Sequence, residues 1–77
     1  MSTLTHVNSP KTLGEALPKE MARVRDEVLP VYLEIGPSGQ FAATMMRLSL
    51  DRATKALAEG DIGAMIDTYN ELKEFRT

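Results

Sequence analysis

Several residue types that carry chemistry are missing or scarce in this chain. It has no cysteine, so disulfides, thiolate metal sites and thiol nucleophiles are excluded. Its one histidine, His6, lies in a polar N-terminal segment, so a histidine-rich metal cluster is impossible. No other grouping of side chains matches a metal-binding or nucleophilic site. We therefore expect no metal and no cofactor, and we do not expect an enzyme.

Long apolar runs and a strong charge bias are also missing. No apolar run approaches the roughly 18 residues that span a bilayer, and no basic region followed by an apolar stretch marks a signal peptide. The net charge is -2, with acids and bases interspersed, whereas a nucleic-acid binder usually carries a basic excess. These absences predict a cytoplasmic protein without membrane association, and the lack of cysteine fits a reducing compartment.

The chain is short but apolar enough to fold. Its 77 residues, 43% of them hydrophobic, are sufficient for one domain with a small core. Domains of this size are often supported by a partner subunit. Residues 1–11 are mostly Ser, Thr, Asn and Pro with little to bury, so we expect a flexible N-terminal tail. Residues 12–77 are expected to form a single helical domain.

The first predicted helix follows a heptad-like apolar pattern, in steps of four and three residues. These positions are Leu17, Met21, Val24, Val28, Val31 and Ile35. Thr12 to Glu15 match a capping box, but Pro18 fits poorly inside a helix, so we expect a turn over 12–17 and a helix over 18–35. Pro30 should kink this helix without changing the phase of the pattern. A short strand over its last five residues is the alternative.

A strong break separates the first helix from the second. Gly36 can end the first helix in a left-handed cap, and Ser38 can cap the next helix. The second predicted helix covers residues 40–59, which contain no Gly or Pro and are rich in good helix formers. Its apolar residues nearly encircle it, which is typical of a helix that contacts two neighbours or a partner.

The last predicted helix covers residues 62–76. Gly60 suits the position after a helix, and Asp61 suits the N-cap of the next one. Because this connection is very short, the second and third helices must be antiparallel neighbours. The sequence therefore predicts an all-α protein of three helices, with the first kinked at Pro30 and the other two forming an antiparallel hairpin.

Two resemblances accompany this pattern. The stretch from Ala53 to Leu72 reads ATKALAEGDIGAMIDTYNEL and resembles one helical hairpin of the tetratricopeptide type. The matching positions are Gly60, Asp61 and Ile62 in the turn, and Met65, Ile66, Tyr69 and Leu72 in the packing face. Met65 departs from the small Ala that this family prefers, and a stable array needs about three repeats. The resemblance thus implies a hairpin and no ligand groove.

The second resemblance covers most of the chain. The run VLPVYLEIGPSGQFAATMM, followed by the hairpin at Gly60 and Asp61, resembles short proteins encoded by phages and prophages of Gram-negative bacteria. Such families rarely carry an assigned role. The resemblance implies a prophage origin and no mechanism.

The stretch from Val28 to Ile35 is the most informative one for function, since all of it is apolar except Pro30 and Glu34. Three of its residues serve the predicted internal face, which leaves the others to form an exposed apolar cluster. One apolar stripe of the 40–59 helix would extend this cluster; it consists of Ala42, Met46, Leu50, Ala53 and Leu57. The predicted interface residues are Leu29, Tyr32, Leu33, Met46 and Leu50. The alternative is a globule in which the tail or the last helix covers them.

These observations favour a small interaction protein. We expect self-association, most simply as a homodimer, or docking onto another protein. The alternative is a small DNA-binding transcriptional regulator that places its second or third helix in the major groove. Arg47, Arg52 and Lys55 lie along the second helix, but Asp51 stands among them. Salt discriminates the two functions, because only DNA binding should weaken steeply as the salt concentration rises.

Overall fold

The computed structural model describes residues 12–77, so the predicted tail over residues 1–11 lies outside the described residues. The elements in chain order are α1 (Leu13–Arg23), a π-helical turn (Val24–Val28), α2 (Leu29–Ile35), a 3-10 turn (Pro37–Gly39), α3 (Gln40–Glu59) and α4 (Ile62–Glu74). This part of the chain contains no strand, which confirms the all-α prediction and rules out the strand alternative. None of these helices combines the length and hydropathy needed to cross a membrane.

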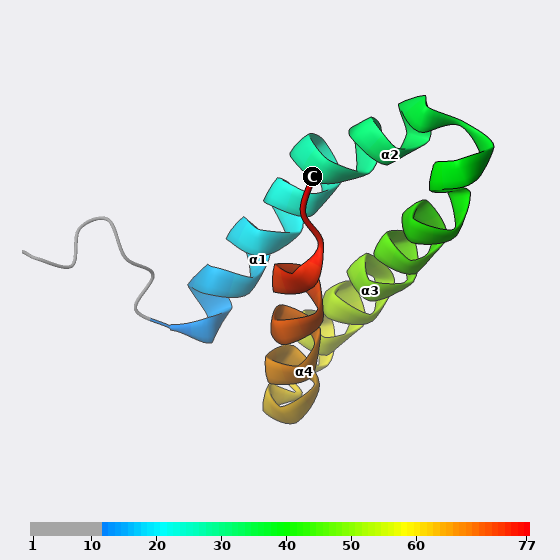
Figure 1. Ribbon diagram of the computed structural model, residues 1–77. Coiled ribbons are helices and arrows are strands. Elements are labelled where there is room, and N and C mark those ends of the chain that lie inside the picture. The colour runs from blue at the N-terminus through cyan, green and yellow to red at the C-terminus, as the bar shows by residue number, and fades with distance from the viewer. Residues whose placement is uncertain (1–11) are drawn as a thin grey trace, which may run out of the picture.

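The first helix is continuous from α1 to α2, and it changes direction between them (Figure 1). At the junction the amide of Leu29 bonds to the carbonyl of Val24, five residues back, which is the spacing of a π-helix. Pro30 follows directly; it has no amide hydrogen, and its ring would clash with the carbonyl of an ordinary α-helical turn. The widened turn accommodates the proline, and the predicted kink is confirmed.

The start of the first helix differs from the prediction. The side chain of Thr12 accepts a hydrogen bond of 3.2 Å from the amide of Glu15, so the helix begins at Leu13 and not near Pro18. Pro18 lies inside the helix on its exposed side. The carbonyl of Gly14, which loses its amide partner to the proline, can therefore bond to water.

The connection between α2 and α3 depends on two glycines. Gly36 has φ 88° and ψ -143°, a conformation open to glycine but not the left-handed helical cap that we predicted. Gly39, and not Ser38, is the N-cap of α3, with no side-chain hydrogen bond. A Cβ at Gly39 would overlap the backbone carbonyl oxygen of Tyr32. The missing side chain thus lets the turn close tightly against α2.

The predicted hairpin of α3 and α4 is confirmed. Gly60 ends α3 in the left-handed conformation, with φ 67° and ψ 27°. The carboxylate of Asp61 then caps α4 by accepting a hydrogen bond of 3.1 Å from the amide of Ala64. α4 runs back along α3 and also lies against α1 (Figure 1).

The core lies where α1, α3 and α4 meet. Its buried residues are Leu17, Val24, Val28, Met46, Ala53, Ala56, Met65 and Leu72. The other end of the molecule is thinner, because α2 packs mainly against the beginning of α3 (Figure 1). We call residues 29–50, which comprise α2, the turn and the first half of α3, the arm.

Candidate interaction surface

The helix α2 is apolar but has no buried residue. Glu34 is the only charged residue among its seven. A helix of this composition normally buries one face against the rest of its domain. Here α4 packs along α3 and α1 but makes no extensive contact with α2, so α2 is covered mainly by α3 alone. The result is apolar surface that remains accessible to solvent.

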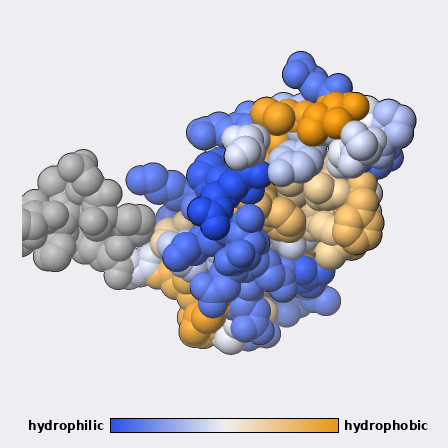
Figure 2. Space-filling view, viewed as in Figure 1, coloured by the Kyte–Doolittle hydropathy of each residue, from blue (hydrophilic) through white to orange (hydrophobic). Residues whose placement is uncertain are grey.

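Five large apolar side chains of the arm are exposed. They are Val31, Leu33, Ile35, Phe41 and Leu48. Phe41 is the most open of them, with 77% of its surface exposed, followed by Ile35 with 53%. Figure 2 shows apolar colours gathered over α2 and the start of α3, whereas hydrophilic colours cover much of α1 and α4, with a smaller apolar area at the lower end of the molecule. Ile62 and Ile66 of α4 are also exposed. The surface of the arm thus differs in chemistry from the surface of the body.

The predicted interface residues do not all lie on this surface. Leu33 is exposed, as the prediction requires. Leu29, Tyr32 and Leu50 are half-buried and pack against the core. Met46 is only 1% exposed and belongs to the core itself, so it cannot contribute to an interface in this conformation. The prediction that Met46 is an interface residue is therefore wrong, because its side chain packs in the core.

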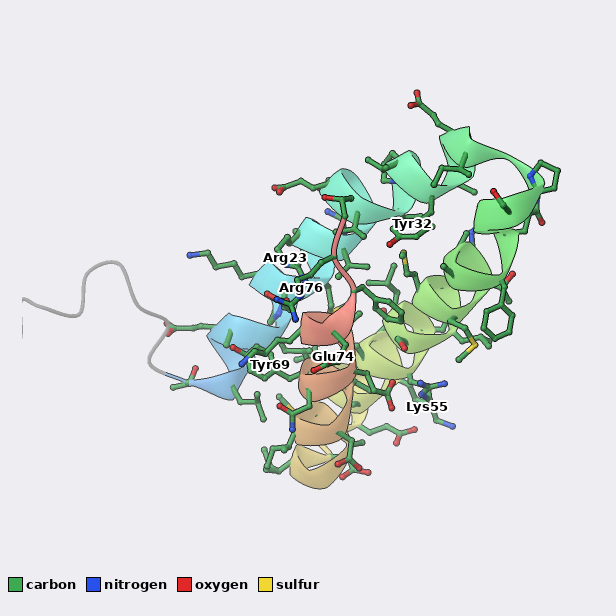
Figure 3. The ribbon with its side chains drawn as sticks, in the orientation of Figure 1. Arg23, Tyr32, Lys55, Tyr69, Glu74 and Arg76 are labelled. Carbon is green, nitrogen blue, oxygen red and sulfur yellow. The ribbon has the colours of Figure 1, made fainter. Side chains whose placement is uncertain are left out.

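The side chain of Tyr32 is anchored within the protein. Its hydroxyl donates a hydrogen bond of 2.8 Å to the backbone carbonyl of Arg76, beyond the end of α4. Figure 3 shows its ring between α2 and α3. This contact holds the C-terminal segment against the arm.

The π-helical turn explains why the predicted phase fails. In α1 and the turn the buried positions follow the expected pattern as far as Val28. A π-turn adds one residue, so the next inward position moves from Val31 to Tyr32. Val31 and Ile35, which we assigned to the internal face, are therefore exposed, and they replace Leu29 and Tyr32 on the surface.

A groove of about 450 Å³ lies along α1 and the π-helical turn, where Tyr69 of α4 borders it. Its lining residues are Ala16, Lys19, Glu20, Ala22, Arg23, Asp26, Glu27 and Tyr69. Several of its charges already have partners. Arg23 pairs with Glu20 at 2.7 Å, and Asp26 pairs with Arg25 at 2.8 Å. The groove therefore offers little concentrated charge to a ligand.

A polar cluster joins α3 to α4. The buried hydroxyl of Ser49 donates a hydrogen bond of 3.0 Å to the carboxylate of Glu71, and Arg52 forms an ion pair with the same carboxylate. The hydrogen bond from Arg52 lowers the pKa of the Glu71 carboxyl, and the bond from Ser49 acts in the same direction. Because Ser49 donates to an acceptor that Arg52 holds, the cluster fixes the register of the helices and does not activate a nucleophile.

This cluster was not predicted from the sequence. The only signal was a serine within an otherwise apolar stripe of α3. This ion pair engages Arg52, which is one of the three basic residues considered above for DNA binding.

Comparison with protein-family models, curated proteins and solved structures gives no match to this chain. The tetratricopeptide and prophage resemblances stay predictions, as does the DNA-binding alternative. The proposed function therefore rests on the geometry of the chain itself.

Proposed function

We propose that this protein is a self-association module that forms a homodimer through its arm. The observation that carries the proposal is that α2, with a single charged residue, has no buried residue in the isolated chain. A second copy is the simplest partner, because a two-fold contact uses the same apolar surface on both sides. An exposed apolar cluster of this kind usually marks an interface.

The energy available fits a reversible dimer. Phe41 alone exposes on the order of 150 Å², since an aromatic side chain carries about 150–250 Å². Complete burial of a large apolar side chain is worth about 1.5–3 kcal/mol, so a half-exposed one contributes about 1 kcal/mol. Two copies offer at most ten such side chains, of which Leu33 lies on a different side of α2 from Val31 and Ile35, against an association cost of about 4–15 kcal/mol. The balance favours a dimer that dissociates on dilution over a permanent one.

Light scattering on matched variants tests the proposal. The wild type should show a mass of about 17 kDa, twice the 8.5 kDa of one chain, at about 100 µM protein. Ile35→Asp places a charge on the arm and should give the mass of a single chain. Ile66→Asp is the control, because Ile66 is also exposed but lies on α4, outside the arm. It should remain dimeric.

Two results would contradict self-association through the arm. The first is a wild type that stays monomeric at this concentration. The second is a dimer that Ile35→Asp leaves intact, or that both substitutions dissociate equally. Far-UV circular dichroism of each variant verifies that the helices are retained, as expected for exposed positions.

A further inference from the structure

The arm carries very few charges. Between Leu29 and Leu50 the charged residues are Glu34 and Arg47, one acid and one base. Both side chains are exposed, and neither forms an ion pair within residues 12–77. In contrast, Arg23 and Arg52 each reach an acid of their own chain. The arm is therefore neutral overall, with one unpaired charge of each sign.

The two charges lie at different distances from the tip of the arm. Glu34 is next to the last residue of α2, close to the turn. Arg47 is seven residues into α3, which is about 10 Å further along the arm at 1.5 Å per residue. Glu34 shares a helix face with the exposed Val31, three positions earlier, and Arg47 is followed directly by the exposed Leu48. The charges thus flank apolar side chains of the arm.

A two-fold axis that crosses the arm between these positions brings unlike charges together. In such a contact, residue i of one copy meets residue j of the other, and the reverse pair forms as well. An antiparallel arrangement of two arms would place Glu34 opposite Arg47 twice. A parallel arrangement would place Glu34 opposite Glu34, which is repulsive.

We propose that Glu34 of one copy pairs with Arg47 of the second copy, and that these two ion pairs select the antiparallel register of the dimer. This inference rests on the proposed self-association through the arm. Apolar burial supplies the affinity, and the charges select the orientation, as rim charges commonly do at protein interfaces.

Charge reversal tests the pairing. With Glu34→Arg each arm carries two basic residues. With Arg47→Glu each arm carries two acidic residues. Either substitution alone turns two attractions into two repulsions and should weaken the dimer about tenfold or more. The double variant restores unlike pairs and should return the dissociation constant to within about threefold of the wild type. Lys19→Glu with Glu27→Lys, on α1 and the π-turn, is the control and should change little.

A mixing experiment strengthens the test. In a one-to-one mixture of Glu34→Arg and Arg47→Glu chains, the mixed dimer has both ion pairs, whereas each homodimer has none. The mixed dimer should therefore dominate, as measured by native mass spectrometry. A dimer whose affinity is unchanged by either reversal, or a mixture that forms only the statistical proportion of mixed dimers, would overturn the pairing while self-association stands. A monomeric wild type would instead overturn the self-association on which the pairing rests.

Discussion

The guanidinium of Arg23 in α1 donates a hydrogen bond of 3.0 Å to the backbone carbonyl of Leu72 in the last turn of α4. It donates a second bond of 3.0 Å to the carbonyl of Phe75, and Glu20 holds it in place at 2.7 Å (Figure 3). The last carbonyls of a helix have no partner within the helix, and a positive group stabilises them. Arg23 thus serves as a tertiary cap for α4, supplied by a residue 49 positions earlier in the chain.

Removal of this cap should destabilise the fold. We expect Arg23→Ala to lower the free energy of unfolding by about 1–3 kcal/mol, because the Leu72 and Phe75 carbonyls lose a charged donor. Urea denaturation followed by circular dichroism, at one fixed protein concentration, measures this. Arg25→Ala is the matched control, since Arg25 is exposed and pairs only with Asp26. Equal losses from both substitutions would contradict the capping role.

The tight turn before α3 gives a second prediction. Gly39→Ala should lower the free energy of unfolding by more than about 1 kcal/mol, because its Cβ would overlap the backbone of Tyr32, which cannot easily move. Gly14→Ala provides the comparison, since a Cβ there meets nothing closer than 3.7 Å and alanine favours a helix. That variant should be neutral or more stable by up to about 1 kcal/mol. Equal behaviour of the two variants in thermal melts would argue against a tight turn.

The sequence predicted the boundaries of the later helices well, because local signals define them. Gly60 and Asp61 combine a left-handed residue with a capping carboxylate, and both act as expected in the structure. Residues 40–59 contain no helix breaker, and α3 covers that range. These features depend on neighbouring residues, so a single sequence is enough to recognise them.

The surface of the first helix was less predictable, because it depends on a change of helix type. A heptad pattern assumes a constant number of residues per turn, and the π-turn before Pro30 violates that assumption. As a result the prediction placed Val31 and Ile35 on the internal face and Leu29 and Tyr32 on the surface. In the structure Val31 and Ile35 are exposed, and Leu29 and Tyr32 are half-buried. The proline indicated a kink, but it did not indicate that an extra residue would be inserted.

Local sequence patterns also did not predict the contacts between residues that lie far apart in the chain. The bonds from Arg23 to the end of α4, and from Ser49 to Glu71, join residues 49 and 22 positions apart. No local pattern in the sequence links the members of either pair. Their pairing depends on how the helices pack, which a single sequence does not reveal.

The polar cluster between α3 and α4 predicts a pH dependence. The Arg52 hydrogen bond lowers the pKa of Glu71 in the folded state, so the unfolded chain takes up this proton first as the pH falls. The stabilisation is present above about pH 4.5 and is lost as the pH falls through the folded pKa. For a partly exposed pair, we expect about 0.5–1 kcal/mol.

A comparison of variants isolates this effect. The difference in unfolding free energy between the wild type and Glu71→Gln should be constant above pH 5 and should shrink below about pH 4.5. Glu74→Gln, which removes an exposed carboxyl three residues further along α4, is the matched control. A difference that does not vary with pH would contradict the role of the ionised carboxylate.

The contrast between Met46 and Phe41 separates folding from association. Met46 lies in the core, so Met46→Ala should lower the free energy of unfolding by about 2–5 kcal/mol. Phe41 is exposed, so Phe41→Ala should barely affect the stability of the monomer, but it should weaken self-association. Denaturation at high dilution and light scattering at high concentration measure the two effects. A large loss of monomer stability in Phe41→Ala would show that the ring belongs to the fold.

Sedimentation equilibrium of the wild type over a range of concentrations tests self-association most directly. We predict that the average mass rises from 8.5 kDa in the most dilute samples towards twice that value at about 100 µM, and that dilution reverses the change. A mass of 8.5 kDa at every concentration would contradict the proposal that the arm binds a second copy.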